Sequence, residues 1–123
     1  FLEDLRQDEA EQKMAELLPR NLRAKAKNYL RAVLLICEKY QVDPLWVVSV
    51  MWTESHFRPL IKSSVGANGL MQVMPKTAQS VAKKLGRKFN EDKLLSDRQY
   101  NIDIGTSFLK TLLEKFDGSK IFY

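Results

Sequence analysis

Apolar residues recur at helical spacing over most of this chain, and prolines and glycines mark where the pattern breaks. Residues 2–18 hold few apolar positions among many charged ones and predict a polar, acidic helix. Pro19 interrupts this pattern, and residues 22–40 then present one apolar face opposite a basic one. The first third of the chain therefore predicts a charged helix followed by a single amphipathic helix.

The next segment differs because it is apolar on nearly every side. Asp43 and Pro44 form a helix start, with the aspartate as N-cap and the proline at the first helical position. Residues 45–52 are apolar except for Ser49. A helix that is apolar all round is buried, so this one is predicted to be the centre of the core. We expect it to end before Pro59, which disfavours a helical residue ahead of it.

The C-terminal half begins with residues 59–74, a glycine-bearing stretch that predicts an irregular loop with a very short β element near residues 63–74. Pro75 opens a further helix that closes before Gly86. After a polar connection, Ser96 and Gln99 form a capping box for a last helix ending at Gly118. The predicted fold class is all-α.

Composition and charge narrow the class of protein. The 123 residues are 45% apolar and 28% charged, which suits one globular domain, and no apolar run approaches the ~20 residues of a membrane span. The net charge of the chain is +5, but residues 1–18 have a net charge of −4, so the other 105 residues have a net charge of +9. This positive charge predicts an anionic partner. Aromatic residues are not interleaved with the basic ones, which argues against nucleic acid.

Single copies of two reactive residue types exclude several chemistries. Cys37 is the only cysteine, which rules out an intrachain disulfide, and its apolar neighbours predict a core position. His56 is the only histidine, which excludes a His-rich zinc site. We expect no metal and no cofactor, and we expect His56 to lie at the surface or to support the site rather than to react.

Glu54 is the strongest candidate for chemistry. It follows the most apolar segment, and the 36 residues between Glu54 and Glu91 contain no Asp or Glu. Apolar neighbours such as Met51 and Trp52, together with the negative end of the helix dipole, would favour the protonated carboxyl group. A protonated glutamate is what a general acid needs in order to donate to a glycosidic oxygen.

Four short motifs after this helix give the chemistry a context. They are Glu54-Ser55, residues 69–72 (Gly-Leu-Met-Gln), residues 74–78 (Met-Pro-Lys-Thr-Ala), and residues 101–109, where Asn-Ile precedes a glycine and Phe-Leu. In this order and spacing they resemble the family-1 lytic transglycosylases over about residues 40–123. The resemblance implies a lysozyme-like fold, peptidoglycan glycan strands as substrate, and an exported protein of the periplasm or cell envelope.

The reaction implied by the resemblance needs one carboxylate. The glutamate, here Glu54, protonates the oxygen between N-acetylmuramic acid and N-acetylglucosamine, then accepts the proton of the C6 hydroxyl as a 1,6-anhydro ring closes. The resemblance also assigns substrate-binding positions around Glu54. They are Ser63, Gly69, Met71, Gln72, Met74 and Thr77.

The resemblance also suggests boundaries. We expect residues 1–20 to form an acidic connector, with a possible further domain before it, and residues 21–123 to form the catalytic domain, as a monomer. The family's closing Ala-Tyr-Asn segment is expected just where Tyr123 stands, so the catalytic domain is predicted to lack it. Two alternatives stay open: a peptidoglycan-binding or regulatory module with little turnover, and a muramidase of the goose-lysozyme kind.

Overall fold

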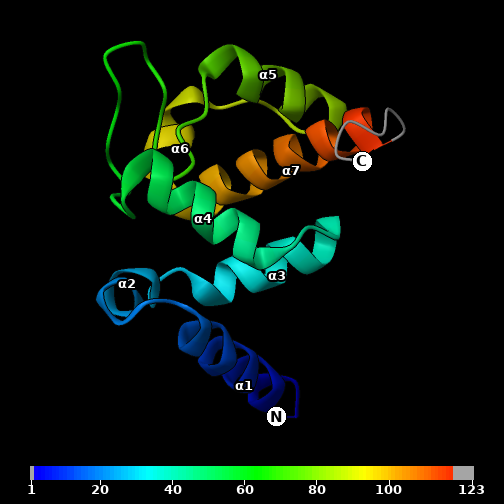
Figure 1. Cartoon of the computed structure of the whole chain (residues 1–123). Helices are drawn as coiled ribbons and strands as arrows, with labels where there is room; N and C mark the ends of the chain where they lie inside the picture. The colour runs from blue at the N-terminus through cyan, green and yellow to red at the C-terminus, as the bar shows by residue number, and fades with distance from the viewer. Residues whose placement is uncertain (1, 118–123) are drawn as a thin grey trace.

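A computed structural model describes residues 2–117 of the chain (Figure 1). These residues form seven helices and no strand. Residues 62, 68 and 73 form two isolated antiparallel bridges, Lys62 with Asn68 and Asn68 with Val73. The helices are α1 (Leu2–Leu17), α2 (Arg20–Ala26), α3 (Leu30–Tyr40), α4 (Pro44–Ser55), α5 (Pro75–Lys84), α6 (Glu91–Ser96) and α7 (Arg98–Asp117). The all-α class with a very short β element is confirmed.

The single amphipathic helix predicted over residues 22–40 is wrong, because the structure divides this region into α2 and α3. The break covers residues 27–29 and includes Tyr29, whose ring is buried and stacks on Phe57 at 6.3 Å between centroids. The Tyr29 hydroxyl donates to the Phe57 carbonyl at 3.4 Å. The apolar pattern gives no sign of the break, since Ala26 and Leu30 on either side are both buried.

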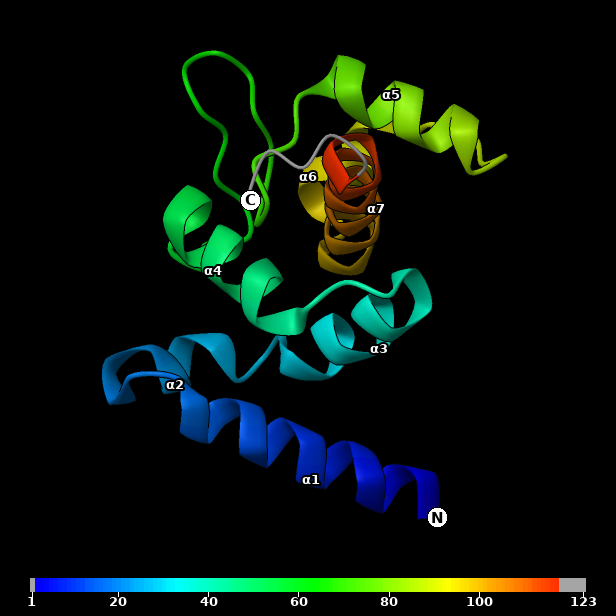
Figure 2. The same ribbon diagram turned by 45° about the vertical axis from the view of Figure 1, so that its right-hand side comes forward.

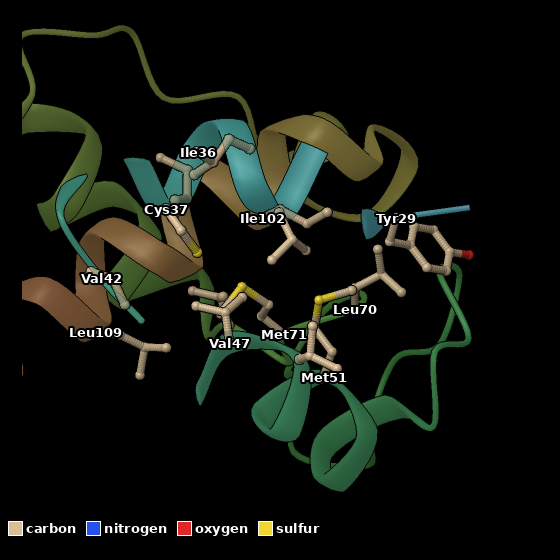
Figure 3. Close-up of a cluster of buried hydrophobic side chains, with 14 of the residues drawn as sticks. Tyr29, Ile36, Cys37, Val42, Val47, Met51, Leu70, Met71, Ile102 and Leu109 are labelled. Atoms are coloured by element: carbon tan, nitrogen blue, oxygen red, sulfur yellow. The ribbon is translucent and has the colours of Figure 1, made fainter. Parts of the chain in front are cut away.

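The core lies where α3, α4 and α7 meet. Figure 3 shows Met51, Leu70, Met71 and Ile102 pointing into one shared space, and Met51, Leu70 and Ile102 have no exposed surface. Helix α7 packs against α3, α5 and α6, and it runs between α3 and α5 in Figures 1 and 2. The central helix of the fold is therefore α7 rather than α4.

Helix α4 is buried on one side only, which corrects the prediction that it is enclosed all round. Val47, Val48 and Met51 are buried, whereas Leu45 is exposed and Val50 is half-buried. Val50 borders a pocket that it shares with residues of α5 and α7. The apolar residues of α4 therefore serve two purposes: some are buried in the core, and Val50 lines a pocket.

Two helix starts in the second half of the chain test the local signals. Helix α5 begins at Pro75, as predicted. Helix α7 is capped by Asp97, whose carboxylate accepts from the Tyr100 N–H at 3.1 Å, so the capping box predicted at Ser96 is wrong. The Ser96 hydroxyl instead donates to the Asp92 carbonyl within the short helix α6, which the sequence pattern did not predict.

The N-terminal helix packs on the rest of the described chain. Met14 and Leu18 are buried in the common core cluster, and Arg31 on α3 pairs with Asp8 and with Glu11, the latter at 2.5 Å. Helix α1 lies along one edge of the molecule and α5 along the opposite edge (Figure 2). No described helix is both long enough and apolar enough to cross a membrane.

Candidate active site

Glu54 lies in the last turn of α4, one residue before the helix ends. The helix stops because His56 adopts a left-handed conformation with φ of 53°, and its N–H donates to the Trp52 carbonyl at 3.0 Å. Phe57 follows with φ of 60°, so two consecutive residues that are not glycine carry a backbone conformation costly for a side chain. This turn directs the chain away just after the carboxylate.

The predicted apolar enclosure of Glu54 is wrong. Its side chain is exposed, whereas Met51 points into the core. Val50, four residues before Glu54 on the same face of α4, lines the same pocket as Glu54. No hydrogen bond or ion pair from a described residue reaches the Glu54 carboxylate, which therefore remains available to a ligand.

A pocket of about 240 Å³ opens beside Glu54. It brings together residues from α4, the loop after it, α5 and α7, and Glu54 is the only carboxylate among them. The lining residues are Val50, Glu54, Met71, Gln72, Val73, Met74, Thr77, Gly105, Phe108 and Leu109. Five positions predicted from the sequence therefore share one pocket: Glu54, Met71, Gln72, Met74 and Thr77.

Gln72 joins the pocket to the loop behind it. Its backbone has φ of 49°, and its side-chain nitrogen donates to the carbonyls of Ile61 at 3.1 Å and Gly69 at 2.9 Å. The amide nitrogen is thus committed to the loop, and the amide oxygen is the atom left to accept from a ligand hydroxyl. Gln72 both holds the loop and lines the pocket.

Met71 forms the floor of the pocket and leaves little of its side chain exposed, 5%. A methyl group built on Gly105 would lie 2.5 Å from the Met71 sulfur, so only glycine leaves room for Met71 there. The Thr106 hydroxyl also donates to that sulfur at 3.8 Å. Met74 is 41% exposed at the start of α5 and forms part of the rim.

Asn101 fixes this loop to α7 although it does not line the pocket. The side chain is 1% exposed and has a partner for each polar atom. Its oxygen accepts from the Met71 N–H at 2.9 Å, and its nitrogen donates to the carbonyls of Asn68 and Leu94, both at 2.8 Å. One buried amide thus ties the loop and the end of α6 to the central helix.

Two predicted site residues lie outside the pocket lining. The Ser63 hydroxyl accepts from the Ala67 N–H at 3.0 Å and closes the loop over residues 63–67. Gly69 is buried with φ of 74°, and a methyl group there would lie 2.4 Å from the Asn101 side chain. Gly69 therefore lets the loop approach Asn101, which also explains why the backbone needs glycine at this position.

Several residues that shape this pocket had no role predicted from the sequence. Val50, Val73, Phe108 and Leu109 line the pocket, and Asn101 supports it from behind. The available signal was the motif over residues 101–109, whose asparagine, glycine and Phe-Leu pair all face this region. Periodicity alone could not distinguish these positions from ordinary core residues.

No cluster of three or more His, Cys, Asp or Glu side chains suited to a metal ion occurs within residues 2–117. Cys37 is buried as predicted, and burial, with the nearby Asp43 charge, raises its pKa to about 12. Its thiol is therefore protonated at neutral pH and poorly nucleophilic.

The fold and the pocket define a class: a helical, lysozyme-like domain with one carboxylate at the edge of a groove. The structure aligns with the lytic transglycosylase Slt, solved as an inactive mutant from Pseudomonas aeruginosa, with a TM-score of 0.66. That alignment covers 88% of this chain and 23% of the other at 22% identity, and shows the fold. The chain belongs to the Transglycosylase SLT domain family, whose sequence pattern matches residues 33–123.

Curated relatives agree with this family. The chain is 37% identical over 105 residues to the membrane-bound lytic murein transglycosylase C of Yersinia enterocolitica, covering 84% of this chain and 29% of the relative. It is 35% identical over 83 residues to the soluble lytic murein transglycosylase of Escherichia coli, covering 67% of this chain and 13% of the relative. The chain thus spans less than a third of the length of either relative.

Proposed function

We propose that this domain cleaves peptidoglycan glycan strands as a lytic transglycosylase, with Glu54 as the catalytic residue. The observation that carries the proposal is the pocket in which Glu54 is the only carboxylate. Membership of the transglycosylase family supports the substrate class, because the relatives named above are murein transglycosylases. We also propose that the protein is exported and acts in the cell envelope.

A single carboxylate is sufficient for this reaction. Glu54 donates its proton to the glycosidic oxygen as the bond from muramic acid C1 breaks. The C6 hydroxyl oxygen of the same sugar then bonds to C1, and its proton passes to the Glu54 carboxylate, which restores the acid. Ordinary glycosidases place a second carboxylate across the bond, and the lining of this pocket supplies none.

The neighbouring residues have roles that follow from their positions. Gln72 presents its amide oxygen to sugar hydroxyls, and Thr77 adds a hydroxyl from the first turn of α5. Met71 and Met74 supply polarizable thioethers against the sugar faces. Ser63 and Gly69 hold the loop that carries Gln72, so we propose that they act on the substrate through the shape of the loop. Within this proposal residues 21–123 form the catalytic domain.

The test is digestion of purified peptidoglycan followed by mass spectrometry of the released fragments. Products ending in 1,6-anhydro-muramic acid are expected, each lighter by one water than the hydrolytic product. Reducing ends alone would identify a muramidase, and binding without release of fragments would identify a binding or regulatory module. The Glu54→Gln variant provides the control, since it keeps the shape of the side chain and removes the transferable proton.

A further inference from the structure

A surface away from the pocket of Glu54 combines exposed apolar side chains with lysines. Leu60 and Val65, in the loop between α4 and α5, are 68% and 75% exposed. Lys62 in the same loop is exposed, and so are Lys76 and Lys83 on α5. We refer to these five residues as the basic–apolar edge, and none of them lines the pocket of Glu54.

The five residues lie at one end of the molecule. In Figures 1 and 2, which differ by a turn about the vertical axis, the loop and α5 both form the upper edge and α1 forms the lower edge. Lys76 and Lys83 are seven residues apart and share one face of α5, opposite the buried Ala78 and Val81. Because α5 packs on α7, which lies below it in both views, the two lysines face outward at the upper edge.

The tip of the loop is held by its own hydrogen bonds. The Ser63 N–H donates to the Ala67 carbonyl at 2.9 Å, and the Gly66 N–H donates to the Ser63 carbonyl at 3.0 Å. The Ala67 N–H in turn donates to the Ser63 hydroxyl at 3.0 Å. A turn that pairs backbone groups internally enters an apolar environment at a lower cost, and this turn presents Val65 at its tip.

The charge around the basic–apolar edge is positive and uncompensated. Residues 55–90 contain seven Lys and Arg residues and no Asp or Glu. No ion pair within residues 2–117 involves Lys62, Lys76 or Lys83. Helix α1, at the opposite edge, carries six acids against two cations. The two edges give the molecule a dipole that turns the basic–apolar edge toward a negatively charged surface.

We propose that the basic–apolar edge docks this domain on an anionic phospholipid membrane. Leu60 and Val65 enter the boundary between headgroups and acyl chains, while the lysines contact the phosphate groups. A soluble acidic polymer would use the lysines alone and would give no role to the two apolar side chains. The inference goes beyond the proposed function, because it concerns the surface on which the domain is held and not the reaction at Glu54.

The test is cosedimentation of the full chain with vesicles of phosphatidylcholine mixed with phosphatidylglycerol, and with vesicles of phosphatidylcholine alone. Binding should be tighter to the anionic vesicles, and it should weaken when NaCl is raised from about 50 to about 300 mM. Lys76→Gln should reduce the partition coefficient about fivefold, the scale of one cation at a membrane surface. Leu60→Ser with Val65→Ser should reduce it about tenfold, the scale of partly burying two apolar side chains. Urea unfolding of each variant checks that it is folded.

Leu17→Ser is the matched control, because Leu17 is 66% exposed but lies on the acidic helix α1. It should bind the vesicles as the parent does. Insertion is measured with a polarity-sensitive dye, since Cys37 is the only cysteine and is buried. The emission of the dye attached at Val65→Cys should shift to the blue on anionic vesicles, and that of the dye at Leu17→Cys should not.

Equal binding to the two kinds of vesicle, or binding to neither, would overturn the proposal. A loss confined to Lys76→Gln, with no shift of the dye at Val65→Cys, would also overturn it and would identify a soluble acidic polymer as the partner. The proposed function fails separately, because Glu54→Gln should lose cleavage of glycan strands and still bind the anionic vesicles as the parent does.

Discussion

The two sides of the catalytic pocket are built differently. On the α4 side, Glu54 is exposed and no described residue holds its carboxylate. On the opposite side, Met71 is almost fully buried, packs against Gly105 and receives a hydrogen bond from Thr106. The proposed reacting group, Glu54, thus has no protein partner, whereas the opposite side of the pocket, formed by Met71, is packed against the core.

This contrast indicates that the two sides of the pocket have different roles, proton transfer on one side and positioning of the sugar on the other. A group that transfers protons must meet its ligand, so burying it among protein partners would block its use. A wall that positions a sugar has to keep its shape, which requires packing and satisfied hydrogen bonds. Substitutions on the two sides should therefore separate activity from stability, and each prediction below tests that separation.

The largest expected effect is on activity alone. Glu54→Gln should lower the rate of fragment release from peptidoglycan by about 10²- to 10⁴-fold, because the amide cannot donate the proton. Its free energy of unfolding should stay within about 0.5 kcal/mol of the parent, since the side chain is exposed and without partners. Urea denaturation beside a turnover assay checks both halves. A large loss of stability would contradict the conclusion that the Glu54 side chain makes no stabilising contacts.

Asn101→Ala should give the opposite result, with stability as the main loss. The change leaves the Met71 N–H and the carbonyls of Asn68 and Leu94 without their buried partner. We expect the free energy of unfolding to fall by about 3 kcal/mol, measured in urea. Asn21→Ala is the matched control, because Asn21 is exposed on α2. A cost below about 1 kcal/mol would mean that the loop is held by other contacts.

Capping residues and prolines in the sequence correctly predicted where α4 and α5 begin. The Asp43-Pro44 start of α4 is confirmed, with the Asp43 carboxylate accepting from the Leu45 N–H at 2.9 Å, and so is the start of α5 at Pro75. The break between α2 and α3 was not predictable from periodicity. It depends on the contact of Tyr29 with Phe57, 28 residues away.

The site residues likewise divide into those that the local sequence predicted and those that depend on long-range contacts. Met71, Gln72, Met74 and Thr77 were predicted from two adjacent motifs within one stretch of chain, and all four line the pocket that contains Glu54. The part played by Asn101 depends on contacts with residues 30 and 33 positions earlier. Such pairings arise only once the helices have packed, so a single sequence does not reveal them.

Gly105→Ala tests how closely the wall is packed. Alanine is the better helix former by about 1 kcal/mol, so an open position would be stabilised by the change. Its methyl group would instead lie 2.5 Å from the sulfur and 2.9 Å from the Cβ of Met71. We expect a net loss of about 2 kcal/mol in the free energy of unfolding, the scale of overpacking. Stabilisation would show that Met71 can move aside.

A double-mutant cycle identifies Met71 as the cause. Met71→Ala removes the atoms that the new methyl group would meet, at the cost of a cavity. Adding Gly105→Ala to Met71→Ala should therefore cost less than adding it to the parent, because the methyl group fills vacated space. If the two costs were simply additive, the clash would lie elsewhere and the wall would be looser than the contacts indicate.

The smallest expected effect lies on the far side of α7, where Asp103 pairs with Arg87 and, at 2.8 Å, with Lys39. Burial alone would raise the pKa of Asp103, but hydrogen bonds from Lys39, Tyr40 and Arg87 outweigh it and hold the pKa below its ordinary 3.8. A lowered pKa in the folded state means that the paired carboxylate stabilises the fold above about pH 4. That contribution is lost as the pH falls through the folded-state value.

Asp103→Asn should therefore remove about 1 kcal/mol of stability at pH 7, a modest figure because the side chains of Lys39 and Arg87 are about half exposed to solvent. It should also reduce the steepness with which stability falls below pH 4, measured by urea unfolding at pH 7, 4 and 3. Asp103 does not line the catalytic pocket, so cleavage at neutral pH should stay within about twofold of the parent. A large loss of cleavage would show that α7 couples its two faces, and the pocket wall would then depend on the whole helix rather than on Asn101 and Gly105.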